Sequence, residues 1–408
     1  MKTNIKLKKI SLLVAILILA NTALLSAEPA IKTDNTTVAQ KEFRGAWVST
    51  VYNLDWPSKK GLSVDQQKAE YIHMLDELQA AGINAVIVQV KPAADALYPS
   101  KHAPWSEYLT GTQGKHPGYD PLAFMIEETH RRGMEFHAWF NPFRITTSGT
   151  KTDKLAANNP AKLHPEWVLK YDNKLFLNPG IPEVRTYVKN TVLEVVKNYD
   201  VDAIHFDDYF YPYPDSKKND IPDRHTYKKF EKAYKNIGDW RRYNINAMIK
   251  DISLSIKQID KDVKFGISPF GVWRNSSATP KGSDTRASIT SYDSIYADTR
   301  YWAYVGWIDY IVPQIYWNIG FGPACYEKTL NWWIKELEDK PVDLYVGHAL
   351  YKVGTEDAWL NPEELPNQIL MNRKSDTVKG SVFFRSKLIL DNMLGFTDRL
   401  KYDLYKHP

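Results

Sequence analysis

The chain has 408 residues, 43% of them hydrophobic, and a formal net charge of +5 at neutral pH. The first 27 residues contain four lysines and no acidic side chain, so the rest of the chain has a net charge of only +1. With this balance, nothing in the composition predicts an electrostatic hold on nucleic acid or on an anionic membrane. The single cysteine, Cys325, excludes an intramolecular disulfide, so the fold must be held by core burial.

The N-terminal segment has the layout of a secretory signal peptide. Its lysines precede an apolar run over residues 10–25, and Ser26 and Ala27 form a small-residue exit, which predicts cleavage after Ala27. The alternative is an uncleaved membrane anchor, but the apolar run is shorter than the ~20 residues that span a bilayer. We therefore expect an exported protein, periplasmic or secreted, with a signal peptide at 1–27, a leader segment at 28–42 and no stable membrane span in the mature form.

Eight short runs beyond residue 42 have the length and composition of buried strands. They are rich in β-branched and aromatic residues and lack a polar face, as in parallel sheets covered on both sides. In chain order these runs are 43–49, 84–92, 134–142, 201–210, 263–272, 308–317, 343–351 and 379–386.

An amphipathic segment follows each of these runs. The first has the capping-box spacing of Ser63 and Gln66, and the second begins with Pro121 at its first helical position. The later predicted helices are 182–199, 224–260 with a break near Gly238, 295–305, 323–338, 361–374 and 388–400.

Eight strands, each followed by a helix, predict a single (β/α)8 TIM barrel over residues 43–400, with 401–408 as a tail. A doubly wound open sheet is the alternative, but the glycine-rich phosphate-binding turn of such folds is missing. Two connections, 93–119 and 143–181, are unusually long and follow the second and third strands. Such loops lie on the C-terminal face of a barrel, where binding sites are built, so we expect them to wall a cleft.

Two adjacent aspartates, Asp207 and Asp208, end the fourth predicted strand, where a buried charge is costly. At a strand end the chain begins to turn, so both carboxyl groups can face one ligand. Cleavage of a glycosidic bond needs a proton donor and a group that stabilises the oxocarbenium-like centre, and a protonated carboxyl beside an ionised one supplies both. The alternative is structural: one aspartate caps the turn or pairs with an arginine.

The sixth strand ends in Pro-Gln-Ile-Tyr-Trp, without the carboxylate that a simple two-carboxylate glycosidase would draw from another strand. An alternative is substrate-assisted cleavage, in which the sugar's N-acetyl oxygen attacks the anomeric carbon, one aspartate orients the acetamide and the other is the acid. The side-by-side pair resembles the β-hexosaminidase and O-GlcNAcase families, and this resemblance implies an N-acetylhexosamine substrate. Loop residues remain alternative second acids: Asp95, Glu107, Asp284, Asp298 and Glu356.

Strand alternation brings further polar residues to the same mouth of the barrel. Residues an even number of positions apart on one strand point to the same face. Such pairs are His205 with Asp207, Gln89 with Lys91, His137 with Asn141, and Gln314 with Tyr316, with Ser268 and Arg385 as weaker additions. Asn141 and Gln314 can hydrogen-bond hydroxyl or acetamido groups, and Lys91 can hold a carboxylate or form an ion pair with Asp207. The alternative for the two histidines is a satisfied place in the barrel core.

Aromatic residues gather at the predicted strand ends and in the loops that follow, where flat rings can stack on pyranose faces. They are Trp105, Trp139, Phe140, Tyr209, Tyr211, Phe270, Trp273, Tyr316, Trp317 and Trp359. Ordinary core packing is the alternative for any single ring. The substrate-binding residues that we expect are Lys91, His137, Trp139, Asn141, His205, Tyr209, Trp273, Gln314, Tyr316 and Trp317.

Other chemistries have less support in the sequence. Metal-dependent polysaccharide deacetylases bind their metal with an aspartate and two histidines four residues apart, and no two of the ten histidines have that spacing. There is no H-E-x-x-H, no G-x-S-x-G and no phosphate-binding loop. We therefore expect neither a metal nor a cofactor.

Six short motifs near the predicted strand ends carry a resemblance. They are Phe43–Trp47, Gln89–Pro92, Ala138–Pro142, Ile204–Tyr209, Ser268–Arg274 and Pro313–Trp317. In this order they resemble the glycosyl-hydrolase-like family ten over about residues 42–400. The resemblance implies a (β/α)8 barrel, an exported bacterial protein and hydrolysis of envelope glycan such as peptidoglycan, with the strand-four aspartates carried onto Asp207 and Asp208. A non-catalytic glycan-binding barrel is the competing class, and a metal-dependent deacetylase is third.

Overall fold

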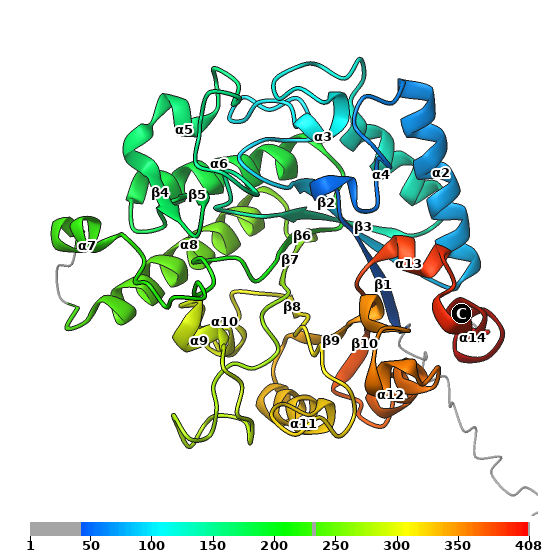
Figure 1. The fold of residues 1–408 in the computed structure, drawn as a ribbon. Coiled ribbons are helices and arrows are strands. Elements are labelled where there is room, and N and C mark those ends of the chain that lie inside the picture. Colours follow the sequence, from blue (N-terminus) through cyan, green and yellow to red (C-terminus); the bar gives the residue numbers. More distant parts are fainter. Residues whose placement is uncertain (1–41, 231–233, 407–408) are drawn as a thin grey trace, which may run out of the picture. The chain divides into compact units, whose positions relative to one another are not determined.

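The computed structural model of the chain describes residues 42–230 and 234–406 (Figure 1). The predicted signal peptide and all but the last residue of the predicted leader lie outside these ranges. No helix among the described residues is long and apolar enough to cross a membrane. The barrel domain extends past the predicted boundary at residue 400, since Leu400–Leu404 form a π-helical turn and Tyr405 is buried.

Eight parallel strands close into a barrel, which confirms the predicted (β/α)8 fold. They are β1 (Phe43–Val48), β2 (Ala85–Lys91), β3 (Glu135–Phe140), β6 (Ala203–Phe206), β7 (Lys264–Ile267), β8 (Tyr310–Ile311), β9 (Asp343–His348) and β10 (Val378–Phe383). The hydrogen-bonded order is β1-β10-β9-β8-β7-β6-β3-β2, so consecutive barrel strands are neighbours and β10 closes on β1. Seven of the eight predicted runs contain one of these strands, and β10 begins one residue before the eighth run.

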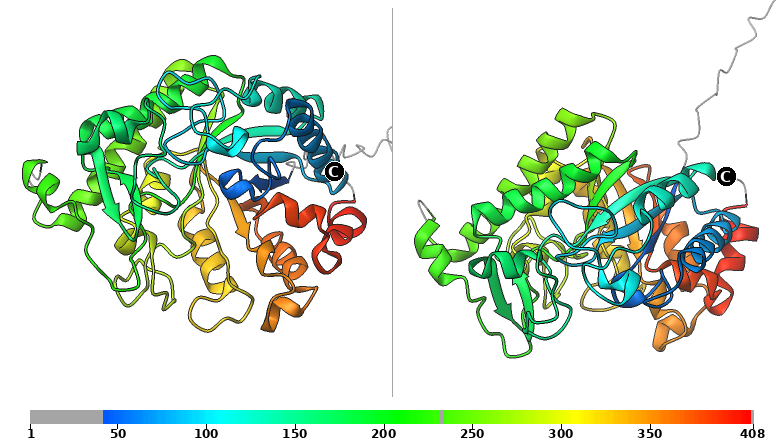
Figure 2. Two further views of the ribbon diagram at one scale, coloured as in Figure 1. Left: turned by 45° about the horizontal axis from the view of Figure 1, so that its top comes forward. Right: turned by 90° about the horizontal axis from the view of Figure 1, so that it is seen from above.

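The helices form a ring around the strands (Figures 1 and 2). They are α2 (Val64–Ala80), α3 (Glu107–Thr110), α4 (Pro121–Arg131), α5 (Pro160–Leu163), α6 (Pro182–Asn198), α7 (Arg224–Phe230), α8 (Ile237–Ile259), α9 (Ser291–Ser294), α10 (Thr299–Tyr304), α11 (Tyr326–Leu337), α12 (Glu364–Asn372), α13 (Ser386–Leu390) and α14 (Phe396–Arg399). Two of the predicted helices, 295–305 and 388–400, are shorter pieces than the sequence suggested.

Local capping explains where several helices begin. Ser63 and Gln66 form the predicted capping box at the start of α2, each side chain accepting from the other's backbone N–H. The break predicted near Gly238 lies a few residues earlier in the chain, because the Asn236 side chain accepts from the backbone N–H of Asp239 and starts α8 there. Gly238 is therefore inside the first turn of α8.

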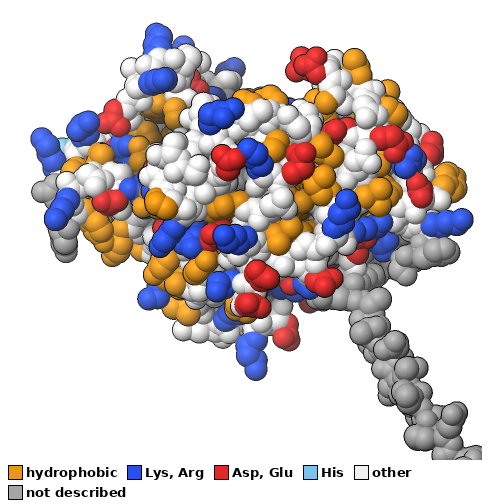
Figure 3. Space-filling view, turned by 90° about the horizontal axis from the view of Figure 1, so that it is seen from below, with side chains coloured by type: hydrophobic (Ala, Val, Ile, Leu, Met, Phe, Trp, Pro, Cys, Tyr) orange, Lys and Arg blue, Asp and Glu red, His pale blue; other side chains and the backbone are white. Residues whose placement is uncertain are grey.

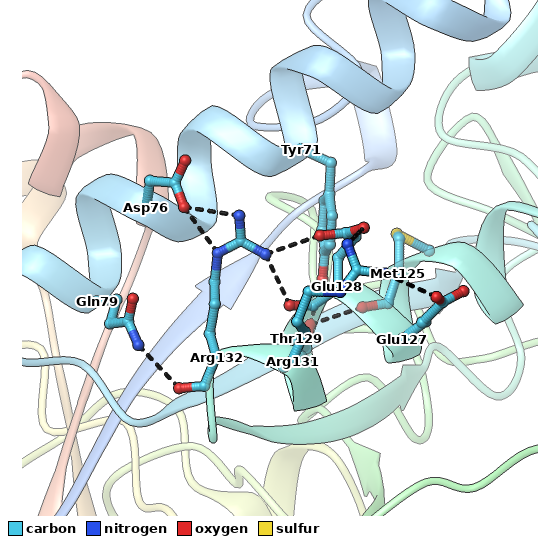
Figure 4. Close-up of polar contacts among 9 residues, drawn as sticks. All are labelled: Tyr71, Asp76, Gln79, Met125, Glu127, Glu128, Thr129, Arg131 and Arg132. Atoms are coloured by element: carbon cyan, nitrogen blue, oxygen red, sulfur yellow. Dashed lines mark hydrogen bonds and ion pairs between the residues drawn. The ribbon is translucent and has the colours of Figure 1, made fainter.

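A half-buried arginine joins the first two long helices of the ring (Figure 4). Arg132, directly after α4, places its guanidinium 2.6 Å from a carboxylate oxygen of Asp76 on α2 and 2.9 Å from one of Glu128 on α4. Next to it, the hydroxyl of Tyr71 on α2 lies 3.0 Å from the hydroxyl of Thr129. These polar contacts fix how α2 and α4 pack over the strands that carry the two long loops.

The long connection 143–181 contains a hairpin that the sequence analysis did not predict. Its strands, β4 (Val168–Tyr171) and β5 (Lys174–Leu177), pair antiparallel around Asp172 and Asn173, whose φ angles of 47° and 52° are those of a tight hairpin turn. Backbone bonds from Ile145 N to Leu175 O (3.0 Å) and from Leu177 N to Phe143 O (2.8 Å) tie the hairpin to the chain leaving β3. These bonds give part of the long connection a regular structure beside the open end of the barrel.

The outer surface carries both acidic and basic side chains. On the side shown in Figure 3, acidic and basic side chains are interspersed with scattered hydrophobic ones. This mixture fits a chain whose described part has nearly balanced charge, and it offers no single-sign field on that side to attract a polyanion.

Candidate active site

A cavity of about 600 Å³ opens at the C-terminal ends of the barrel strands. The residues that line it come from the strand ends, the loops that follow them and the β4–β5 hairpin. Among the residues predicted for the site, the lining includes Trp139, Asp207, Asp208, Tyr209, Gln314, Tyr316 and Trp317. Gln89, Ser268 and Phe270, which the sequence also singled out, line it as well. The position at the C-terminal face is the one expected for a barrel enzyme.

Asp207 follows β6 and is held by three donors. Its Oδ2 accepts from the indole N–H of Trp139 at 3.1 Å and from the side-chain amide of Asn141 at 2.9 Å. Its Oδ1 accepts from the backbone N–H of Tyr209 at 3.1 Å. Only 4% of the residue is exposed, so the carboxyl group is fixed in orientation and nearly dry.

Asp208 has a separate set of partners. Its Oδ1 accepts from the side-chain amide of Gln314 at 3.0 Å, and its Oδ2 accepts from the Tyr213 hydroxyl. Gln314 is itself anchored by a 2.9 Å bond to the backbone carbonyl of Ser268. Asp208 is 6% exposed and lines the same cavity as Asp207. The two neighbouring carboxyl groups therefore face the same cavity, and each is held by its own set of hydrogen-bond donors.

Burial and mutual repulsion control the protonation of this pair. Burial and the neighbouring Asp208 raise the pKa of Asp207 to about 7. Burial also raises the pKa of Asp208, against the hydrogen bonds from Tyr213 and Gln314, which lower it. Because the two groups interact, they titrate as a unit, and the pair keeps its last proton until the pH rises to about 7. One acid and one anion then lie side by side at the cavity wall.

Arg144 places a positive charge at the cavity. It follows β3, lines the cavity, and lowers the pKa of both aspartates through its charge. Its guanidinium carbon lies 4.7 Å from the centre of the Tyr209 ring, and its backbone N–H donates to Oδ1 of Asn141 at 3.2 Å. Asn141 is thereby fixed with its amide nitrogen toward Asp207, although Asn141 itself lies behind the cavity wall.

The hairpin closes one side of the cavity with four residues that the sequence analysis did not predict: Tyr171, Asp172, Lys174 and Phe176. Lys174 and Asp172 form an ion pair at 2.7 Å, so their charges offset one another. Tyr52, Tyr213, Tyr351 and Phe384 add rings from other loops. The lining is thus mainly aromatic with a few fixed polar groups, as in many small-molecule and sugar sites.

His137 and His205, expected in the substrate site, lie below the cavity in the barrel interior. Their Nδ1 atoms lie 2.8 and 3.0 Å from the hydroxyl of Tyr310. The Tyr310 ring fits because β7 has a glycine opposite it: a Cβ on Gly266 would lie 2.0 Å from the ring. Burial lowers the pKa of His205 well below its ordinary value, so this imidazole is neutral. Both side chains therefore match the alternative reading, in which they are buried core histidines whose ring nitrogens have hydrogen-bond partners.

Lys91 and Trp273 also lie outside the cavity lining. Lys91 does not pair with Asp207; its Nζ donates to the backbone carbonyl of Ala93 at 2.6 Å, and burial lowers its pKa to about 8. The β2–β3 pairing shifts register between Gln89 and Lys91, so alternation fails there and the two side chains do not share a face. Trp273 donates to Asp298 at 3.1 Å and stacks on Trp332 of α11.

Within the described part of the chain, no three His, Cys, Asp or Glu side chains are grouped so that they could hold a metal ion. Of the loop acids weighed as a second carboxylate, Asp95 is buried beside Lys91, and Asp298 receives the Trp273 indole N–H. Glu107 is paired with Lys60 and Asp284 with Lys328. None of these, nor Glu356, lines the cavity.

Similarity to known proteins agrees with the geometry. The model of the family described as glycosyl hydrolase-like 10 matches residues 42–361. Over 373 residues the chain is 54% identical to glycosyl hydrolase YngK of Bacillus subtilis, covering 91% of this chain and 73% of that protein. It is 41% identical to glycosyl hydrolase DigH of Escherichia coli K12, covering 86% of this chain and 84% of that protein.

A solved structure shares the fold. The glycoside hydrolase domain of PgaB (BpsB) from Bordetella bronchiseptica has a TM-score of 0.53 at 13% identity, covering 89% of this chain and 99% of that chain. At this identity the likeness shows the barrel alone. The sequence relatives and the family match are what support a function of the glycoside hydrolase type.

Proposed function

Since the chain belongs to the glycosyl hydrolase-like 10 family, we propose that it is an exported glycoside hydrolase that cleaves N-acetylhexosamine-containing polysaccharide, with the glycan strands of peptidoglycan as its substrate. The carrying observation is the pair Asp207 and Asp208, adjacent in the chain, buried, and facing one cavity through different hydrogen-bond partners. Its export to the periplasm or the medium rests on the N-terminal sequence pattern.

The pair supplies the two roles that glycoside cleavage needs. The protonated carboxyl gives its proton to the glycosidic oxygen as the bond to the anomeric carbon breaks, while the ionised carboxyl stabilises the positive charge that develops. Gln314 and Asn141 hold the two carboxyls in place, so neither has to reorient during the reaction. Asp207 and Asp208 divide these roles between them.

Substrate assistance completes the scheme without a carboxylate from another strand. The acetamido oxygen of the sugar attacks the anomeric carbon and forms a cyclic intermediate while one aspartate accepts the amide N–H in a hydrogen bond. Water then opens that intermediate and returns its proton to the carboxylate that acted as the acid. The rings of Tyr316, Trp317 and Tyr209, which line the cavity, offer faces for the sugar.

The test is release of new reducing ends from purified peptidoglycan glycan, with and without stem peptides, by the mature protein. Asp207→Asn and Asp208→Asn are compared with the wild type, and an unchanged melting temperature shows that each variant is folded. We expect either change to reduce release by at least ~100-fold, since it removes the acid or the stabilising anion.

The other outcomes assign the competing classes. Binding of glycan without release of reducing ends would leave a glycan-binding barrel. Release of acetate that stops with a chelator would indicate a deacetylase. Cleavage that continues in the double variant would move the acid to another residue.

A further inference from the structure

Arg144 has hydrogen-bonding capacity in the cavity that the protein itself does not use. Of its five N–H donors, the side chain spends one on the backbone carbonyl of Pro92 at 3.3 Å. It forms no ion pair with any carboxylate in the part of the chain that the structure describes. Its remaining nitrogens are not among the enclosed polar atoms that lack a partner, so they are accessible to solvent, and Arg144 lines the cavity.

The other cation on the cavity lining differs in this respect. Lys174, on the hairpin, is 2.7 Å from Asp172, and the two charges offset one another. Arg144 is stacked on Tyr209, which holds the plane of the guanidinium and leaves its N–H edges free. A half-buried, oriented and unpaired guanidinium is the fork that binds a carboxylate through two parallel hydrogen bonds.

We propose that Arg144 binds a carboxylate carried by the substrate, so that the site is specific for a glycan with an acidic sugar beside the bond that is cut. The inference rests on the proposed function and names the substrate feature that this side chain reads. A substrate carboxylate entering next to Asp207 and Asp208 would be repelled by their negative charge. Arg144 offsets that repulsion and gives the acidic sugar a partner.

A second role for Arg144 is already visible and must be separated from the first. Its charge lowers the pKa of both aspartates, so its removal alters catalysis of any substrate. That effect is the same for acidic and neutral glycans. Carboxylate binding is therefore measured by the ratio of the affinities for the acidic and the neutral glycan, and not by either affinity alone.

The experiment measures binding and turnover of three glycans by the whole mature protein. The first is peptidoglycan glycan freed of stem peptides, whose muramic acid residues carry a lactyl carboxylate. The second is the same glycan with those carboxylates amidated by methylamine, and the third is N-acetylated chito-oligosaccharide, which has none. The proteins are the wild type, Arg144→Gln, Arg144→Lys and Arg300→Gln. Arg300 lies outside the cavity lining, stacks on Tyr304 and pairs with Glu336, so it is a matched control.

We expect Arg144→Gln to weaken binding of the acidic glycan by at least ~10-fold and to change binding of the two neutral glycans by less than ~2-fold. Wild-type protein should bind the amidated glycan as weakly as Arg144→Gln binds the acidic one. Arg144→Lys keeps the charge but not the fork, so it should recover less than half of the lost binding free energy. Arg300→Gln should match the wild type.

Equal losses for acidic and amidated glycans would overturn the inference and leave Arg144 with its electrostatic role alone. Binding that discriminates by carboxylate without any turnover would uphold the inference and refute the proposed function. If the wild type binds none of the three glycans, both fail.

Discussion

Asn141, at the end of β3, and Asp207, at the end of β6, are joined by a 2.9 Å hydrogen bond from the side-chain amide to the carboxylate. The carbonyl end of the same amide accepts the backbone N–H of Arg144, so the amide cannot flip without losing a bond. Two neighbouring strands thereby fix the plane of the carboxyl group at the cavity.

Replacing Asn141 with alanine should lower kcat/KM by about 10- to 100-fold, because a hydrogen bond to a charged group contributes ~1.5–3 kcal/mol. The loss should fall on kcat more than on KM, since Asn141 lies behind the cavity lining and orients the carboxyl group. Steady-state kinetics measure both. Asn372→Ala is the control, because Asn372 is another buried amide, lies outside the cavity lining and accepts a hydrogen bond from the Tyr326 hydroxyl. An equal loss in that variant would indicate general destabilisation.

The sequence was sufficient for the barrel because its strands are buried on both faces and read as continuous apolar runs. The hairpin was missed for the opposite reason. The segment 168–177 mixes apolar residues with Lys170, Asp172, Asn173 and Lys174, which read as a polar loop, although the Asp-Asn turn between two apolar stretches was an available hairpin signal.

The candidate site was predicted where position along a strand decides which way a side chain points. Asp207, Gln314 and Tyr316 are such cases, and all three line the cavity. Other expected residues do not line it: Lys91, His137, Asn141, His205 and Trp273. Lys91 departs from the alternation because the irregular β2–β3 register depends on the pairing of two strands and cannot be read from either strand alone. Arg144 went unremarked since its place depends on stacking against Tyr209, a contact between residues 65 positions apart.

The raised pKa of Asp207 predicts that the site destabilises the fold at neutral pH. An aspartate with a pKa of 3.8 in the unfolded chain and about 7 in the native state lowers the free energy of unfolding as pH rises from about 4 to 7, after which the effect is constant. Asparagine at this position has no such dependence. Relative to the wild type, Asp207→Asn should therefore gain ~3 kcal/mol between pH 4 and pH 7.

Urea unfolding at several pH values checks this slope, and the exposed Asp376→Asn is the matched control. A stability difference that stays flat across this range would show that Asp207 is already ionised at pH 4 in the native state.

Replacing each of the two neighbouring arginines at the end of α4 should change the stability of the fold by different amounts. Arg132 has 13% of its side chain exposed and holds Asp76 and the nearly buried Glu128, whereas Arg131 is 60% exposed and contacts Glu127 and Glu128 from outside. Arg132→Met should lower the free energy of unfolding by ~2 kcal/mol, because it leaves a buried carboxylate with less compensation. Arg131→Met should cost less than ~0.5 kcal/mol. Chemical denaturation of both variants tests the contrast, and similar losses would contradict the burial argument.

The pH dependence of turnover should report the proton that the aspartate pair shares. Activity needs one protonated and one ionised carboxyl, so the profile is bell-shaped, and its alkaline limb should lie near pH 7, where the pair loses its proton.

Tyr213 donates to Asp208 and stabilises the ionised form. Tyr213→Phe removes that donor, so the pair should hold its protons more tightly and both limbs should move to higher pH. Tyr211→Phe is the control, because the Tyr211 hydroxyl is buried outside the cavity lining and does not contact Asp207 or Asp208. A shift to lower pH in Tyr213→Phe, or the same shift in both variants, would mean that the Tyr213 hydroxyl does not set the charge of the pair.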